Sequence, residues 1–192
     1  MSLLSAIPVG LLIGRLLGGR VRNLERLALH WWPLILAALA IQLVIFTSVV
    51  PVPDQAIPIF YVLSNGLAFA WLVRNIRIAG IPCVTLGSLG NLAAIVANGG
   101  RMPVDGTLLA RSRGSAFANA VAHGQTASNA VIADAHTRLI WLTDRFLLPP
   151  PFPLPVVFSL GDVLIGIGVA WLIAAGMRRE VVPGVGTVAR AA

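Results

Sequence analysis

The sequence predicts an all-α integral membrane protein: a helical bundle of about five transmembrane helices with an additional interfacial helix on the outer side. Three observations lead to this prediction. Hydrophobic residues make up 57% of the 192 residues and charged residues only 11%, with a mean hydropathy of +0.88. Five apolar runs approach the roughly 20 residues needed to cross about 30 Å of hydrocarbon. The formal net charge of +7 is distributed so that it falls on one side of the resulting topology.

The first apolar run, residues 3–19, contains Pro8 and is the weakest of the five. A signal peptide is the alternative interpretation, and it expects positive charge before the run and a small-residue cleavage site after it. In this sequence the first charged side chains lie near the end of the apolar run or after it: Arg15, Arg20, Arg22 and Arg26. We therefore predict a retained helix, in which the long Arg15 side chain reaches towards the headgroups.

Four further runs are predicted to span the membrane: residues 31–50, 58–73, 78–98 and 156–177. The first of these ends at the prolines of residues 51–54, which stop a helix. The run over 78–98 has Pro82 near its start and Gly99-Gly100 after its end, an arrangement typical of helix boundaries. Pro155 precedes the last run. We expect the whole chain to form a single membrane domain.

The distribution of arginine predicts the orientation, because cytoplasmic loops carry an excess of basic residues. With the N-terminus outside, nine arginines and two glutamates lie on the cytoplasmic side, against five arginines and five aspartates outside. We therefore predict a multi-pass protein of the bacterial inner membrane with its tail, residues 178–192, in the cytoplasm. The excess of arginine gives the chain a pI of 11.6, and membrane orientation together with contact with anionic lipid headgroups explains this excess. No nucleic-acid partner is therefore expected.

Residues 99–155 form the long outer connection, and a connection of this length usually carries structure or function. A short helix is expected over residues 116–123, capped by Ser115. Apolar residues at helical spacing predict a second helix over residues 126–147, lying on the outer membrane surface. The prolines of residues 149–155 predict an extended spacer.

Four predicted spans carry a polar side chain at similar depth: Gln42, Asn65, Asn91 and Asp162. With a rise of about 1.5 Å per residue, each lies roughly 10 to 12 Å from the outer surface. Unsatisfied polar groups are costly in hydrocarbon, so we expect the four to meet inside the bundle. Two interpretations remain open. The contacts can be structural, or they can form an outward-facing ligand pocket together with Asn98, Arg101 and Asp144.

Asp162 is an ionisable side chain inside a predicted span, and such a residue indicates function by default. We expect a buried ion pair with one of three outer arginines: Arg101, Arg138 or Arg145. A proton-transfer role is the alternative, but no second carboxylate lies near Asp162 in a span.

Small residues at regular spacing predict close helix packing. They are Gly10, Gly14 and Gly18 in the first run and Gly161, Gly166 and Gly168 in the last. The neighbour of these surfaces can be another helix of this chain or another protein.

No residue set for a reaction or a cofactor is found. The three histidines, His30, His123 and His136, are not paired within spans, as haem ligation would require. His123 and His136 could share a surface metal with Asp134 or Asp144, but polar side chains are common on exposed segments, and this explains them better. We therefore predict no catalytic residue, no cofactor and no metal site.

Three blocks of sequence resemble DUF5317, a family of bacterial membrane proteins of unknown function: residues 98–104, 137–144 and 159–162. The resemblance covers most of the chain, and it implies a small polytopic membrane protein with no assigned activity. All three blocks fall on the predicted outer side.

The function expected from these observations is that of a non-catalytic accessory or scaffold subunit, in contact with the bilayer and with other subunits of a larger membrane complex. The alternative is a binding protein for a small molecule or lipid headgroup, either a carrier or an enzyme, with an outward-facing polar pocket.

Overall fold

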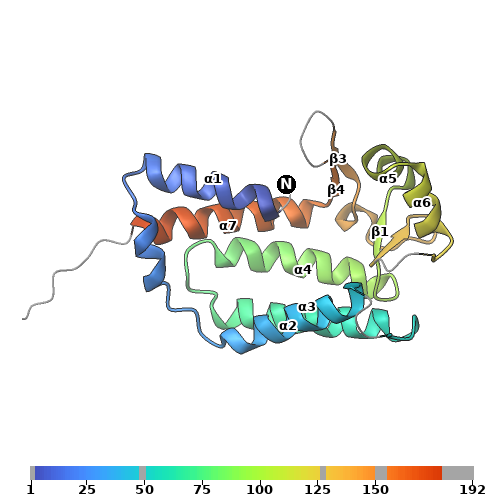
Figure 1. The fold of residues 1–192 in the computed structure, drawn as a ribbon, viewed down its shortest axis with the longest axis horizontal. Coiled ribbons are helices and arrows are strands. Elements are labelled where there is room, and N and C mark those ends of the chain that lie inside the picture. The colour runs from blue at the N-terminus through green and yellow to red at the C-terminus, as the bar shows by residue number, and fades with distance from the viewer. Residues whose placement is uncertain (1–2, 48–50, 126–128, 150–154, 179–192) are drawn as a thin grey trace, which may run out of the picture.

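The computed structural model describes residues 3–47, 51–125, 129–149 and 155–178. It is mostly helical (Figure 1). The five long helices are α1 (Leu3–Leu16), α2 (Trp32–Thr47), α3 (Ile57–Arg74), α4 (Ile81–Ala97) and α7 (Leu160–Arg178). Successive long helices run in opposite directions along the row (Figure 1).

The long helices pack side by side as a row rather than a closed bundle. Their main contacts place them in the order α1, α7, α4, α3 and α2 (Figure 1). The three inner helices each contact a long helix on both sides, whereas α1 and α2 form the two edges. A row leaves two broad faces uncovered, and these faces carry many of the exposed leucine, isoleucine and valine side chains.

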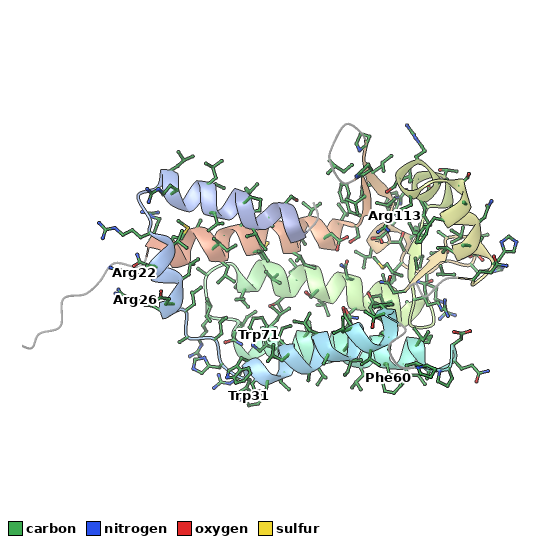
Figure 2. All side chains as sticks on the ribbon, in the orientation of Figure 1. Arg22, Arg26, Trp31, Phe60, Trp71 and Arg113 are labelled. Atoms are coloured by element: carbon green, nitrogen blue, oxygen red, sulfur yellow. The ribbon has the colours of Figure 1, made fainter. Side chains whose placement is uncertain are left out.

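The two ends of the row differ in charge and in structure. At one end, which we call the arginine end, a 3-10 helix, η1 (Val21–Arg26), packs against α7. Figure 2 shows Arg22 and Arg26 there, far from Arg113 at the other end. Asn23 Nδ2 and the backbone N–H of Arg20 both donate to Met177 O, at 2.8 and 2.9 Å, so η1 is fixed to the last turn of α7.

The opposite end carries a cap made of the described residues between α4 and α7. Its elements are β1 (Met102–Val104), α5 (Gly106–Arg113), α6 (Ser115–Ala122), β2 (Ala130–Ile132), η2 (Ile140–Leu142), β3 (Phe146–Leu148) and β4 (Val156–Phe158). Strands β1 and β2 pair in parallel, with Met102 opposite Ala130, and β3 and β4 pair antiparallel, with Phe146 opposite Phe158. Buried Val104, Leu109, Ala118 and Val121 give the cap its own small core.

The predicted surface helix over residues 126–147 is wrong. Its described part, residues 129–147, contains β2, η2 and the start of β3 instead. Leu139 has a φ of +51°, a left-handed conformation that interrupts a right-handed helix. Asp134 and Thr137 also form a local turn, in which the Asp134 N–H donates to Thr137 Oγ1 at 2.8 Å. Such side-chain bonds compete with helix formation.

The shorter helix predicted over residues 116–123 is confirmed as α6, but its predicted cap is not. Ser115 is the first residue of α6, and Gly114 occupies the cap position without a side-chain bond. A true cap occurs one helix earlier. Asp105 Oδ1 accepts from the N–H groups of Thr107 and Leu108 at 2.9 and 3.1 Å at the start of α5.

The last long helix starts later than predicted. Residues 156–158 form β4, so α7 begins at Leu160 and Asp162 lies in its first turn. The other predicted runs agree with α1 to α4 to within a few residues at each end, where residues are described. Three predicted segments lie outside the described residues: the tail beyond Arg178, the proline-rich residues 150–154 and the start of the predicted surface helix, residues 126–128.

Two of the described helices, α3 and α7, are long and apolar enough to cross a membrane by length and composition. The apolar stretches of α1, α2 and α4 are shorter. The arrangement with five spans therefore stays a prediction.

The glycines predicted to allow close packing do so within the chain. A Cβ atom added to Gly10 of α1 would lie 2.8 Å from the Ala170 carbonyl oxygen of α7. One added to Gly168 of α7 would lie 2.7 Å from the Gly80 carbonyl oxygen, at the start of α4. Gly18 is different, because its φ of +78° ends α1 and nothing lies near it. The internal neighbour, rather than a partner protein, therefore occupies these surfaces.

Candidate functional site

The polar residues at the cap end meet where α4, α7 and the cap join. Asp162 and Ser159 form a capping box at the start of α7, in which each side chain accepts from the other residue's backbone N–H at 3.1 Å. Asn91 of α4 completes the group, because its Nδ2 donates to Asp162 Oδ1 at 2.8 Å while its Oδ1 accepts from Ser159 Oγ at 2.9 Å. We call these three residues the junction triad.

The expected ion pair between Asp162 and an outer arginine is not formed. Among the described residues, the Asp162 carboxylate is held by Asn91 and by the Ser159 backbone. Arg145 lies over the Trp141 ring instead, with its guanidinium carbon 4.5 Å from the ring centroid. Each oxygen of the Asp162 carboxylate accepts one hydrogen bond, one from Asn91 Nδ2 and one from the Ser159 N–H. These two neutral donors take the place of the predicted arginine.

Asp144 brings a second carboxyl group to the junction. Its backbone is fixed to β1, since its N–H donates to Pro103 O and its carbonyl accepts from the Asp105 N–H, both at 3.0 Å. Burial first, and the negative charge of Asp162 second, raise the pKa of Asp144 to about 7. Its carboxyl group therefore changes charge near neutral pH.

Asn98 ties the end of α4 to the cap. Its Nδ2 donates to Arg138 O and its Oδ1 accepts from the Arg138 N–H, both at 2.9 Å. The Asn98 side-chain amide thus bonds both backbone polar groups of Arg138, as the backbone of a neighbouring strand would. Among the described residues, Arg101 forms no ion pair, so its predicted part in a pocket has no support from side-chain contacts.

Replacing Asn98 with alanine removes both bonds to Arg138 and is expected to lower the free energy of unfolding by about 1 to 2 kcal/mol. Urea unfolding of the purified protein in detergent micelles measures this loss. Asn119, exposed on α6, provides a matched control, because no bond from its side chain is found in the described structure. Equal losses for Asn98→Ala and Asn119→Ala would contradict the assignment.

The four polar residues predicted to meet inside the bundle are distributed over separate contacts. Asn91 and Asp162 bond to each other, as described. Gln42 Nε2 donates to Ser64 Oγ at 3.2 Å and so joins α2 to α3, while Asn65 Nδ2 donates to Tyr61 O, one turn earlier in its own helix, at 2.8 Å. The described hydrogen bonds support structural contacts between helices more than a shared pocket.

Sequence reasoning missed three contributors to this end of the molecule. For Ser159 the signal is present in the sequence, because a serine three residues before an acid at the start of an apolar run is the signature of a capping box. Tyr61 and Asn129 gave no such signal. The Tyr61 hydroxyl accepts from Asn129 Nδ2 at 2.6 Å, a contact between residues 68 positions apart.

Removing the acid of the junction triad tests its structural role. Asp162→Ala leaves the Ser159 N–H and Asn91 Nδ2 without their acceptor, and is expected to lower the free energy of unfolding by about 2 to 4 kcal/mol. Ser159→Ala is expected to cost about 1 to 2 kcal/mol. Because the two residues share bonds, the double variant should lose less than the sum of the two. Strict additivity would contradict a capping box.

The three sequence blocks that resemble a known family come together in this region. Asn98 of the first block binds Arg138 of the second, Asp144 of the second binds Pro103 of the first, and the third block contributes Ser159 and Asp162. In the described part of the chain, no group of three His, Cys, Asp or Glu side chains is placed to hold a metal ion.

Comparison with known proteins gave one family match. No curated protein and no solved structure matches the chain. Residues 26–174, which include the junction triad and almost all of the long helices α2 to α4 and α7, match DUF5317, a family of unknown function. The chain therefore belongs to the DUF5317 family.

Proposed function

We propose that this chain is an integral membrane protein whose five long helices all cross the bilayer, and that it acts as a non-catalytic accessory or scaffold subunit of a larger membrane assembly. The open row of helices carries the proposal. Leu36, Leu39 and Leu43 on the edge helix α2 are 51%, 57% and 63% exposed. A helix that is apolar all round belongs in lipid or against a protein partner.

The ends of the row support a membrane-spanning placement. The arginine end holds Arg15, Arg20, Arg22, Arg26, Arg74, Arg77 and Arg178. Exposed Trp31 lies at the same end, with Arg74 5.6 Å from its ring centroid (Figure 2). Trp141 is exposed at the cap end. Tryptophan at both interfaces and arginine on one side are typical of membrane proteins, with the arginine side in the cytoplasm.

Helix lengths are compatible with this placement. At 1.5 Å per residue, α3 and α7, with 18 and 19 residues, extend about 27 to 29 Å. The 14 to 17 residues of α1, α2 and α4 extend about 21 to 26 Å. A bilayer accommodates shorter helices by local thinning and through flanking side chains that reach the interface.

A role in assembly is supported by the edge of the row. Helices α2 and α3 form an apolar groove of about 390 Å³, lined by Ala40, Ile41, Val44, Ile45, Val52 and Phe60. The polar groups of the junction triad, by contrast, bond to one another. The uncovered surface therefore favours packing against apolar partners over turnover of a substrate.

Co-purification tests the proposal. The tagged full chain, expressed at its native level and extracted in mild detergent, is expected to bring a partner in fixed stoichiometry. Ala40→Trp fills the groove and should release that partner while the protein still accumulates. Ala37→Trp, on the same helix but outside the groove lining, is the matched control. A lone monomer with full function in vivo would reject the accessory role.

A second candidate is a binding or proton-exchanging site at the outer end, and Asp144 is the observation that favours it. Its carboxyl group accepts no hydrogen bond within the described residues, and its pKa lies near neutral. Under this alternative, Asp144→Asn abolishes function in vivo although the protein accumulates normally. Unchanged function in Asp144→Asn would exclude it.

A further inference from the structure

A cavity at the arginine end has the charge of an anion-binding site. It encloses about 450 Å³ and is lined mainly by residues of η1 and by the ends of α1 and α7. Its arginines are Arg20, Arg22, Arg26 and Arg178, and no acidic side chain is among the described lining residues. None of the four forms an ion pair with another described residue.

The backbone around this cavity is fixed. The bonds from Asn23 Nδ2 and the Arg20 N–H to Met177 O satisfy the last turn of α7 and hold η1 beneath it. Asn23 and Met177 also line the cavity. The guanidinium groups therefore start from backbone positions set by the packing, which lowers the entropy lost when they gather around an anion.

An apolar groove continues from the cavity along the row. It encloses about 520 Å³ between α1 and α7, and it shares Leu17 and Arg178 with the arginine cavity. Val9 and Ile13 line one wall, and Trp171, which is 57% exposed, lines the other. From Val9 to Leu17 the groove follows about 12 Å of helix.

We propose that the cavity and groove together bind one anionic phospholipid, with the headgroup phosphate among the arginines and part of one acyl chain along the groove. Arginine binds phosphate oxygens through two parallel N–H bonds, and four arginines favour an anionic over a zwitterionic headgroup. The continuous apolar groove selects a lipid rather than a soluble phosphate. The inference rests on the proposed membrane placement, because it puts the arginine end at the headgroup level of the inner leaflet.

Native mass spectrometry of the full chain in detergent tests the inference, with equimolar dioleoyl phosphatidylglycerol and dioleoyl phosphatidylcholine as probes. One phosphatidylglycerol is expected to bind at least about tenfold more tightly than phosphatidylcholine. Arg22→Gln/Arg26→Gln should remove this preference. Arg111→Gln/Arg113→Gln on α5 changes the net charge equally and should keep it. Ala175→Phe obstructs the groove and should weaken binding with the arginines intact.

Three outcomes would overturn the site. Equal binding of the two lipids, or equal losses in the two double variants, would show no selective headgroup contact. Complete displacement by millimolar glycerol 3-phosphate would indicate a soluble-anion site instead. The same variants are also tested for recovery in the membrane fraction. Absence of a lipid preference in the unmodified chain, when that chain is recovered in the membrane fraction, rejects this inference alone. Recovery of the unmodified chain as a soluble protein rejects the proposed membrane placement instead.

Discussion

Gly168→Val is expected to separate α7 from α4 and to lower the free energy of unfolding by about 3 kcal/mol. A Cβ atom at residue 168 would lie 2.6 Å from Val84 Cγ2 and 2.7 Å from both the Val84 nitrogen and the Gly80 carbonyl oxygen. Two of these three atoms belong to the backbone, so no side-chain rotation relieves the overlap. Helix α7 lies in the interior of the row, and its displacement disturbs its contacts with α4 and α1.

Gly66 in α3 is the control for this substitution. Nothing lies within 4 Å of a Cβ atom built there, and alanine has the higher helix propensity, so Gly66→Ala should be neutral or stabilise by up to about 1 kcal/mol. Chemical unfolding of both variants in one detergent measures the contrast. A Gly168→Val protein as stable as the unmodified chain would contradict the close contact between α4 and α7.

Stability is expected to fall as the pH rises from about 4 to about 7, because of Asp144. In the folded chain its pKa is about 7, raised from an ordinary value of 3.8. Between these values the folded protein keeps a proton that the unfolded chain has released, so acid favours folding and the advantage is lost as the pH approaches 7. After allowance for partial exposure of the carboxyl group, the change is about 2 to 3 kcal/mol.

Asp144→Asn keeps the shape of the protonated carboxyl group but cannot ionise, so it should abolish this part of the pH dependence. Melting temperatures measured between about pH 4 and about pH 8 are expected to converge at low pH and to favour the variant at high pH. Asp134→Asn, at an exposed position in the cap, is the matched control for the removal of one carboxyl group. A profile for Asp144→Asn that parallels that of the unmodified protein would show that Asp144 is not the responsible group.

The long helices could be predicted because their signal is local and repeated over many residues. Apolar runs of helical length, ended by Pro51 and Pro53 or by Gly99 and Gly100, define α2 and α4 to within a few residues where they are described. The close helix packing predicted from the glycine spacing is observed at Gly10 and Gly168. The order of the helices in the row could not be predicted, because apolar residues on every side of a helix do not indicate which side faces a neighbour.

The cap could not be predicted in the same way, since its strands are three residues long and β1 pairs with a strand that is distant in the sequence. Met102 pairs with Ala130, 28 positions away, and no turn signal links them. The left-handed Leu139 is unusual for a leucine and has no local sequence signature. The candidate site was predicted in part: Asn91 and Asp162 do meet, but the late start of α7 places Asp162 at a helix cap, where Ser159 and not arginine is its partner.

We propose that the row of helices crosses a membrane with the arginine end in the cytoplasm and the cap outside. Site-directed cysteine labelling tests it most directly, in a Cys83→Ala background that removes the chain's single cysteine. Ser115→Cys in α6 places an exposed thiol at the cap end of the row, and Ala28→Cys beyond η1 places one at the arginine end. With a membrane-impermeant maleimide, intact cells should label Ser115→Cys at once and Ala28→Cys only after permeabilisation. Labelling of Ala28→Cys in intact cells, with Ser115→Cys protected, would contradict the claim.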